Sequence, residues 1–179
     1  EKLNEPLKWH KPSRIFVCSM GDLFHEDVPF EYIDRIFQII SFAPMHTFII
    51  LTKRPDRMEQ YINSDRPNHR YIGYNKSGEP INWPLRNLWL GVSIENQEQA
   101  NKRIPILLRI HAAVHLVSIE PMLGPINLTN VPLAHLPDDL LDSIIYRDED
   151  KKLKLINKLD WVICGGESGP GARPMHPDW

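Results

Sequence analysis

The sequence has few of the residues from which disulfide frameworks and membrane spans are built. Two of its 179 residues are cysteines, Cys18 and Cys164, and both lie within apolar runs. Two buried thiols favour a reducing compartment over a disulfide framework. No segment approaches the roughly 18 consecutive apolar residues that a spanning helix requires, and the first residues lack a signal-peptide pattern. We therefore expect a cytoplasmic protein with no membrane partner.

The sequence also has little net charge. The formal value is −2, from 21 basic and 23 acidic residues, so no field across the whole chain attracts nucleic acid. A local contact with a phosphate backbone stays open, because Arg66, Arg70 and Lys76 are interleaved with Tyr71 and Tyr74. A solvated insertion is the safer interpretation of this segment.

Several short motifs of common enzymes are missing. The first predicted strand is followed by SMGDL rather than a glycine-rich dinucleotide fingerprint, and Walker A, HExxH and GxSxG motifs are absent. The eight histidines show no metal-ligand spacing. We therefore expect no metal site from this chain, and a classical Rossmann site is disfavoured.

What the sequence does contain is an alternation of apolar runs and amphipathic segments. Such an alternation is typical of an α/β fold with mostly parallel, buried strands, and it leaves open a doubly wound sheet or a (β/α) barrel. The expected strands are residues 15–19, 48–51, 88–94, 115–119 and 159–164. The expected helices are residues 30–42, 56–62 and 97–110, the last with Asn96 as its N-cap and with Pro105 expected to shorten or kink it.

The length is sufficient for one domain with a sizeable core. We expect a single α/β domain over residues 1–179, with polar insertions at about 63–86 and 127–158. The first residue is Glu1 rather than Met, and residues 174–179 look like the start of a helix. These features predict a fragment of a longer protein.

Polar or charged residues follow every predicted strand. The carboxyl ends of parallel strands lie at one edge of a sheet, where active sites form. The residues concerned are Ser19, Asp22, Thr52, Lys53, Arg54, Ser93, Glu95, Ser118, Glu120, Glu167 and Ser168. Each could be an ordinary cap or surface charge, but their presence at all the strand ends favours a shared site.

The third and fourth strands end alike, in GVSIE and LVSIE. Each places a serine and a glutamate two residues apart, on the same side of a strand. A hydroxyl and a carboxylate together suit a ligand with hydroxyls or an amine. The last strand instead runs into a glycine-rich turn around Glu167, where a ligand could approach the backbone closely.

Several segments together resemble a phage- and bacterium-borne family of unknown function, whose sequence pattern is similar to radical S-adenosylmethionine (radical SAM) enzymes. The segments are CSMGDLF at 18–24, FIILTKRPDRM at 48–58, LWLGVSIENQ at 88–97, HLVSIEPMLGPI at 115–126 and WVICGGESGPGARPMHPDW at 161–179. The resemblance implies a partial (β/α) barrel of the TIM type, in which residues 15–19 form the second barrel strand.

The resemblance also implies cofactors. Radical SAM enzymes hold a [4Fe–4S] cluster on three cysteines and use it to cleave S-adenosylmethionine to a 5′-deoxyadenosyl radical. This chain lacks the three-cysteine motif, and Cys18 and Cys164 do not replace it. The intact protein would therefore bind the cluster and S-adenosylmethionine, whereas this fragment would hold no cluster and would be inactive alone.

Roles for individual residues follow from the same resemblance. The cofactor-binding candidates are Gly21, Asp22, Ser93 and Glu95, although the usual Gly-Gly-Glu is replaced by Met-Gly-Asp at the first pair. The catalytic candidates, which would face an unknown substrate, are Lys53, Arg54, Glu120 and Glu167.

Two other classes of function stay open. One is a catalytically silent barrel that binds nucleic acid or a protein partner. The other is a hydrolase or lyase that uses the paired carboxylates. Three closely spaced cysteines in the intact protein would favour the radical enzyme. An activity lost on changing Glu95 or Glu120 to Gln would favour the hydrolase.

Overall fold

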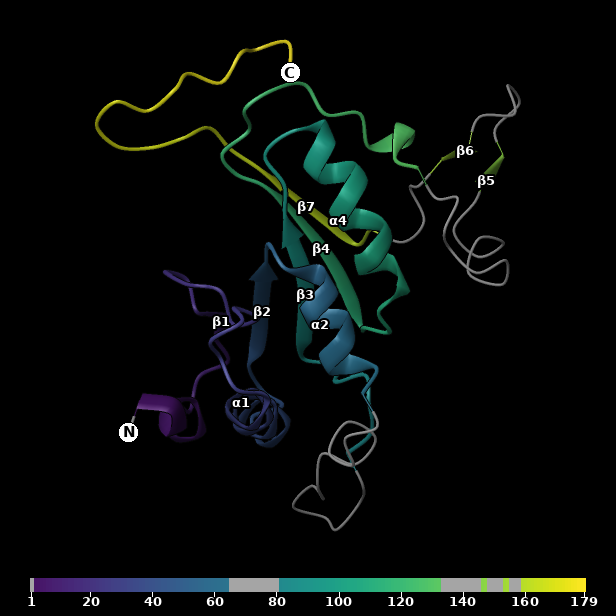
Figure 1. The fold of residues 1–179 in the computed structure, drawn as a ribbon. Helices are drawn as coiled ribbons and strands as arrows, with labels where there is room; N and C mark the ends of the chain where they lie inside the picture. Colours follow the sequence, from purple (N-terminus) through teal and green to yellow (C-terminus); the bar gives the residue numbers. More distant parts are fainter. Residues whose placement is uncertain (1, 65–80, 133–145, 148–152, 155–158) are drawn as a thin grey trace.

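The computed structural model describes residues 2–64, 81–132, 146–147, 153–154 and 159–179, and its main feature is a five-stranded sheet (Figure 1). All four strand pairings are parallel, and the strands lie side by side in chain order. The strands are β1 (Arg14–Val17), β2 (Thr47–Thr52), β3 (Leu88–Ser93), β4 (Val114–Ile119) and β7 (Trp161–Cys164). The predicted α/β class and parallel sheet are thus confirmed.

Helices connect the first four strands. The helical elements are η1 (Lys2–Lys8), α1 (Phe30–Phe42), α2 (Pro55–Ile62), α4 (Gln97–Arg109) and η2 (Leu128–Asn130), and a small antiparallel pair is formed by β5 (Tyr146–Arg147) and β6 (Leu153–Lys154). The Asn96 side chain accepts from the Gln99 amide at 3.0 Å, which confirms the predicted cap. Pro105 lies within α4, which continues to Arg109, one residue short of the predicted end, with Ile104, Leu107 and Leu108 buried in the core.

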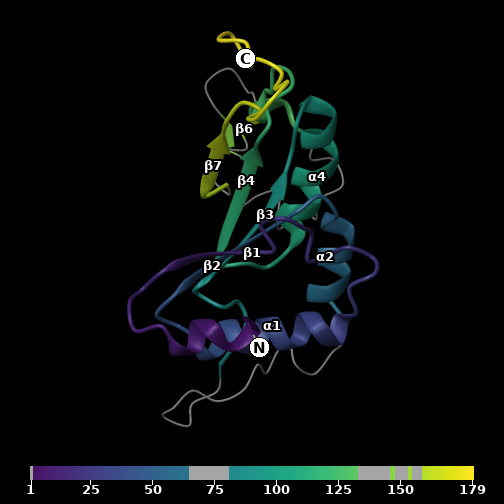
Figure 2. The ribbon, with the colours of Figure 1, turned by 90° about the vertical axis from the view of Figure 1, so that its left-hand side faces the viewer.

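The helices and one face of the sheet enclose the core. Leu88, Leu90 and Val92 alternate along β3 with more exposed or smaller residues and pack in one cluster with residues of α1, α2 and α4. Figure 2 shows α2 and α4 on the same side of the strands. This arrangement follows from the strand order: right-handed crossovers that always advance in one direction place their helices on one face.

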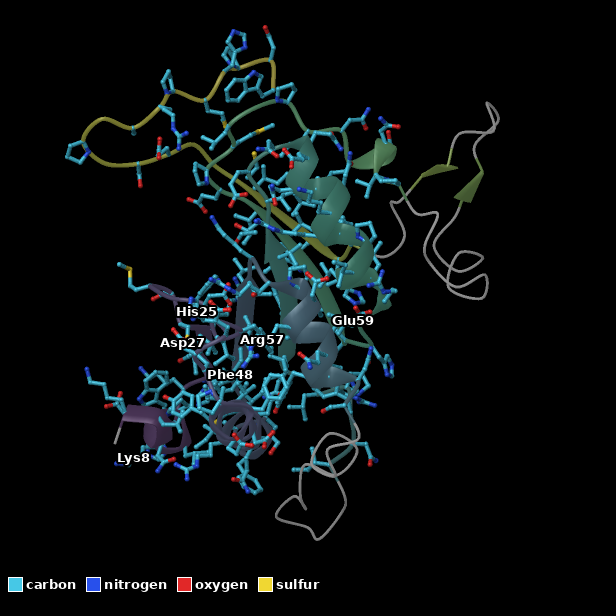
Figure 3. The ribbon with its side chains drawn as sticks, in the orientation of Figure 1. Lys8, His25, Asp27, Phe48, Arg57 and Glu59 are labelled. Carbon is cyan, nitrogen blue, oxygen red and sulfur yellow. The ribbon has the colours of Figure 1, made fainter. Side chains whose placement is uncertain are left out.

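Two arginines join neighbouring parts of this helical layer. Arg109 on α4 donates to both carboxylate oxygens of Glu59 on α2, at 2.7 and 2.8 Å. Arg57 lies on α2, as does Glu59 (Figure 3). It donates to the Val28 carbonyl at 2.7 Å and lies 4.5 Å above the ring of Phe30. The paired hydrogen bonds and the cation–π contact fix α2 between α4 and the start of α1.

The sheet is open, with β1 and β7 at its edges and no pairing between them. Several predictions of burial are therefore wrong. The strand β7 is exposed along its whole length, with Trp161 50% exposed, and Cys18 and Cys164 are both exposed. An apolar run predicts burial only when something covers it, and within the described residues nothing covers the outer edge of β7.

Three further predictions concern the ends and insertions. Residues 174–179 form turns rather than the expected helix. Most of each insertion predicted at 63–86 and 127–158 lies outside the described residues, as does the whole tyrosine-containing basic segment at 66–76. Across the described part, no helix is long and apolar enough to cross a membrane.

Candidate functional site

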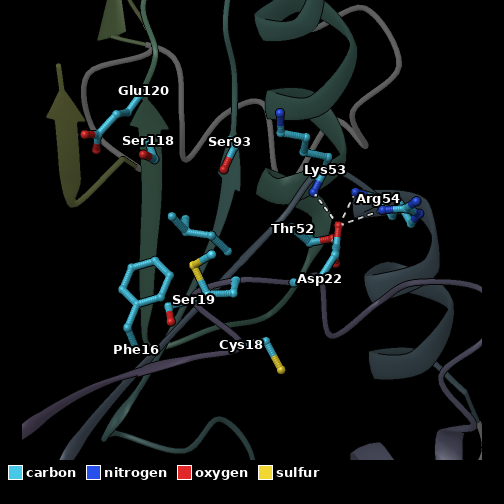
Figure 4. Close-up of a pocket in the computed structure, with 13 residues that line it drawn as sticks. Phe16, Cys18, Ser19, Asp22, Thr52, Lys53, Arg54, Ser93, Ser118 and Glu120 are labelled. Carbon is cyan, nitrogen blue, oxygen red and sulfur yellow. Dashed lines mark hydrogen bonds and ion pairs between the residues drawn. The ribbon is translucent and has the colours of Figure 1, made fainter. Parts of the chain in front are cut away.

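A cavity of about 590 Å³ lies at the carboxyl ends of β1 to β4 (Figure 4). Its lining residues come from the loop after β1 and from the last residues of the next three strands. They are Phe16, Cys18, Ser19, Met20, Gly21, Asp22, Leu51, Thr52, Lys53, Arg54, Ser93, Ser118 and Glu120. We refer to this cavity as the strand-end pocket.

Beneath the pocket, residues of β2 and β4 pack closely against Gly91 in the middle of β3. A Cβ atom at Gly91 would collide with the Leu116 carbonyl oxygen and would lie 2.7 Å from Leu51 Cδ2. Leu51 lines the pocket, whereas Leu116 is fully buried. The missing side chain at Gly91 therefore lets Leu51 and Leu116 approach each other over the strand.

One side of the pocket is organised by Asp22. Its Oδ1 accepts from Thr52 Oγ1 at 2.7 Å and from the Phe24 amide at 2.9 Å, and its Oδ2 accepts from the Lys53 amide and from Arg54 Nη1, both at 3.0 Å. Burial alone would raise the pKa of Asp22, but these four hydrogen bonds together hold the pKa below its usual value. Asp22 thus ties the loop after β1 to the end of β2. We call this group the Asp22 corner.

The cation next to this corner is also paired. Lys53 Nζ forms an ion pair with Glu95 Oε1, and Arg103 on α4 binds Glu95 Oε2 at 3.1 Å. Arg103 also donates to the carbonyl of Ser93. The side chains of Glu95 and Arg103 are only 14% and 15% exposed, so Glu95 lies behind the pocket wall and holds Lys53 rather than lining the cavity itself.

The opposite side of the pocket is formed by the end of β4. Ser118 is paired in register with Ser93 and is 4% exposed, and Glu120 follows it at the pocket mouth. The Gly165 amide donates to the Ile119 carbonyl at 3.1 Å, and the Met122 amide donates to the Gly165 carbonyl at 2.9 Å. Gly165 thus holds the backbone on both sides of Glu120. We call this group the Glu120 corner.

Glu167 lies apart from the pocket. Arg173 donates to it from its side chain at 2.8 and 3.0 Å and from its backbone amide at 2.9 Å. The side-chain hydrogen bonds from Arg173 and its backbone bond lower the pKa of Glu167 to about 2. Gly169 and Gly171, at φ of +104° and +78°, allow the turn between the two residues. Glu167 therefore closes its own loop.

The two cysteines lie in separate places. Cys18 lines the pocket with φ at 56°, and burial together with the nearby Asp22 carboxylate raises the pKa of its thiol. Cys164 Sγ lies 3.5 Å from Met122 Sδ at the end of β7. Among the described residues, no group of three or more His, Cys, Asp or Glu could hold a metal ion. These side chains therefore do not fit an iron–sulfur cluster.

Most of the predicted site residues come together. Gly21, Asp22, Lys53, Arg54, Ser93 and Glu120 line the pocket. Glu95 lies behind the pocket and Glu167 outside it. Their assigned roles stay predictions.

Sequence reasoning missed the lining residues Phe16, Met20 and Leu51, and it missed Arg103 altogether. A signal for Arg103 existed: it lies about two turns into the helix that follows Glu95, on a long side chain that can reach back to the end of β3.

The comparisons with known proteins identify a family. The family model described as "Protein of unknown function (DUF5131)" matches residues 1–179, so the chain belongs to this family. The searches of curated proteins and of solved structures found no match. The predicted membership of a family of unknown function is confirmed, whereas phage association and likeness to radical SAM enzymes stay predictions.

Proposed function

We propose that this DUF5131 protein binds S-adenosylmethionine in the strand-end pocket, as part of a radical SAM-type enzyme that acts on a second molecule. The observation that supports the proposal best is the convergence of four strand ends on one cavity of about 590 Å³. This volume lies within the range of roughly 300–1,000 Å³ that is usual for small-molecule sites. The edge of the sheet is also where parallel α/β proteins bind their ligands.

The strand order supports a partial (β/α) barrel over a doubly wound sheet. A doubly wound sheet reverses its strand order at the point where it binds a ligand. The described sheet has the order β1-β2-β3-β4-β7, with no reversal. A series of βα units that always adds its next strand on the same side is how a (β/α) barrel is built, and this sheet would form part of its wall.

The pocket residues suit the chemical groups of S-adenosylmethionine. The hydroxyls of Ser93 and Ser118 can bond the ribose or the amino-acid end of the cofactor, and Phe16 and Leu51 offer apolar surface to its adenine. At Gly21, an added Cβ would meet nothing within 4 Å, so a ligand can reach the backbone there. When bound, the cofactor would supply a 5′-deoxyadenosyl group to the reaction.

The remaining predicted residues support this site in different ways. Asp22 and Arg54 fix the loop that carries Gly21, and Glu95 positions Lys53. Lys53 and Glu120 then face the substrate from opposite sides of the pocket, while Glu167 would act through its own loop. Cys18 and Cys164 do not fit a [4Fe–4S] cluster, so we assign no step to such a cluster in this chain; the intact protein would bind it through other residues.

Calorimetric titration of the full chain with S-adenosylmethionine and with S-adenosylhomocysteine tests the binding. We expect Ser93→Ala to weaken binding about tenfold, the usual loss when a ligand forfeits a hydrogen bond in a closed site. Ser168→Ala is the matched control, because Ser168 is exposed in the loop after β7. No binding, or equal binding by both variants and the unchanged protein, would contradict the proposal.

The redox part needs a separate experiment on the intact protein. Anaerobic reconstitution with iron and sulfide should produce absorbance near about 400 nm, which is typical of such clusters. A reductant and S-adenosylmethionine should then yield 5′-deoxyadenosine. If neither the absorbance nor the product appears, the enzymatic part of the proposal fails, whatever the titration shows.

A further inference from the structure

We infer that the substrate of the strand-end pocket presents a positively charged nitrogen group, such as an amine, amidine or guanidine, to Glu120. The inference rests on the proposed function, because it assigns a second ligand to the same pocket. It comes from the pairing of the charged side chains around the cavity, from the ordered backbone beside Glu120, and from the neutral serines at the ends of β3 and β4.

The cations at the pocket already have carboxylate partners. Arg54 is paired with Asp22 at 3.0 Å, and Lys53 is paired with Glu95. Glu95 in turn holds a second cation, Arg103. Among the residues that the structure describes, Glu120 is the one charged side chain of the pocket lining without a hydrogen bond or ion pair. The pocket therefore has a free negative charge on the β4 side and paired charges on the β2 side.

The backbone beside Glu120 is ordered by hydrogen bonds, although no cation binds the Glu120 side chain in the described structure. The two hydrogen bonds of Gly165, to Ile119 and from Met122, fix the backbone around Glu120. A Cβ at position 165 would lie 3.3 Å from Glu120 Oε1 and 3.4 Å from its Cδ, so the side chain passes directly over the bare glycine. The backbone that carries Glu120 is therefore ordered, so that a bound ligand has to order only the side chain.

The neighbours of Glu120 favour a charged donor over a neutral one. Ser118, two residues before Glu120, and its register partner Ser93 are neutral and can accept further hydrogen bonds from the same ligand group. A ligand that displaces water here leaves the carboxylate in a less polar setting. Bonds between a cationic N–H donor and a carboxylate are about twice as strong as neutral ones, so a cation recovers most of the lost hydration.

Three probes of one shape test the inference. Benzamidine is a cation, benzamide is its neutral counterpart and benzoate is an anion, and the benzene ring suits the apolar part of the pocket. Each is titrated into the full chain, with and without saturating S-adenosylhomocysteine, and followed by ligand-observed NMR. We expect benzamidine to bind at least about tenfold more tightly than benzamide, as a charge-assisted bond predicts, and benzoate not to bind.

Two variants assign this preference to Glu120. Glu120→Gln keeps the shape and removes the charge, and should lower benzamidine affinity about tenfold, to the level of benzamide. Glu120→Asp should restore part of the preference. Glu98→Gln makes the same chemical change outside the pocket, at an exposed position on α4, and should leave the affinity unchanged. Equal binding of benzamidine and benzamide, or a preference that survives in Glu120→Gln, would overturn the inference.

Titration of the Glu120→Gln variant with S-adenosylhomocysteine alone separates the two proposals. Unchanged affinity for this ligand, with the benzamidine preference lost, supports a substrate role for Glu120. A loss of S-adenosylhomocysteine affinity of the same size, with benzamidine displaced by that ligand, overturns the inference, because Glu120 would then hold the cofactor's own ammonium group. If S-adenosylhomocysteine does not bind the unchanged protein but the Glu120-dependent preference persists, the proposed function fails and the cation site stands.

Discussion

The Asp22 corner and the Glu120 corner lie at two sides of one pocket, and each contains one carboxylate. Both carboxylates follow a strand of the same parallel sheet. Asp22 accepts four hydrogen bonds from two segments of chain, and its side chain is 15% exposed. Glu120 accepts none from the described residues and is exposed. One acid therefore stabilises the fold, and the other is available to a ligand.

The contrast shows that position at a strand end does not by itself define a role. The two corners differ in the number of hydrogen-bond donors that the segment after the neighbouring strand directs at the carboxylate. The end of β2 turns directly into α2 and points one backbone amide and two side chains toward Asp22 in the loop after β1. The residues after β4 instead turn toward β7 and engage the backbone, which leaves the Glu120 side chain free.

The largest expected effect is a loss of folding stability when the charge of the Asp22 corner is removed, compared with the same change at the Glu120 corner. Asp22→Asn places an NH2 group opposite donors, so we expect a loss of about 2–3 kcal/mol in the free energy of unfolding, the usual cost of breaking hydrogen bonds to a charged group. Glu120→Gln should change it by less than about 0.5 kcal/mol, as is usual for exposed sites. Urea unfolding monitored by circular dichroism measures both. Equal losses in the two variants would remove the distinction between the corners.

A smaller effect is expected when pH is lowered, because the contribution of Asp22 to the free energy of unfolding then decreases. Because the pKa of Asp22 is lowered in the folded state, its charged form stabilises the protein above the unfolded value of 3.8, and this stability is lost as pH falls through the lower folded value. The difference in unfolding free energy between the unchanged protein and Asp22→Asn should therefore be constant from pH 7 to about 5 and shrink below about 4. Urea unfolding at a series of pH values checks it. A difference that stays constant down to pH 2 would contradict the assignment.

A change next to Glu120 should alter binding rather than stability. The Cβ added by Gly165→Ala would lie 3.3 Å from Glu120 Oε1, so the carboxylate must shift by a few tenths of an ångström. We expect benzamidine affinity to fall about threefold, well below one kcal/mol. Gly124→Ala is the control, because an added Cβ there meets nothing within 4 Å. An unchanged affinity in Gly165→Ala would show that Glu120 is not held by this contact.

The smallest effect is expected at the third strand-end acid, Glu167. Arg173→Ala removes the side-chain partner that lowers its pKa to about 2, so the pKa should rise toward the ordinary value of 4.5. Carbon-detected NMR of the Glu167 carboxyl over a pH series measures this shift. Benzamidine affinity should stay the same, since Glu167 lies outside the pocket. A change in that affinity would mean that the loop after β7 takes part in binding.

Much of the fold could be predicted because its signals are local. The helix at 30–42 was predicted with the bounds that α1 has, since its apolar spacing is strict and a proline precedes it. The cap at Asn96 depends on residues three apart and was also predicted. The exposure of β7 could not be, because an apolar run carries no information about which neighbour covers it. Cys18 leaves the strand early, at positive φ, which its residue type does not indicate.

The location of the site could be predicted from the sequence, but most of the contacts between its side chains could not. Parallel strands place their ends at one edge, so the gathering of Asp22, Lys53, Ser93 and Glu120 followed from the fold class. The choice of ion-pair partner for each charged residue depends on the length and direction of its side chain. Glu95 turns toward Lys53 and Arg103, and Glu167 turns back to Arg173. These pairings are set by loop geometry that residue spacing alone does not specify.

The hydrogen bonds of Asp22 also have a consequence for the order in which the protein folds. Its partners Thr52, Lys53 and Arg54 are 30 to 32 residues away, so these bonds require the loop after β1 to meet the end of β2. We expect them to form late in folding, once β1 and β2 have paired. Such interactions slow unfolding more than they speed folding. We therefore expect Asp22 to act mainly on the lifetime of the folded pocket.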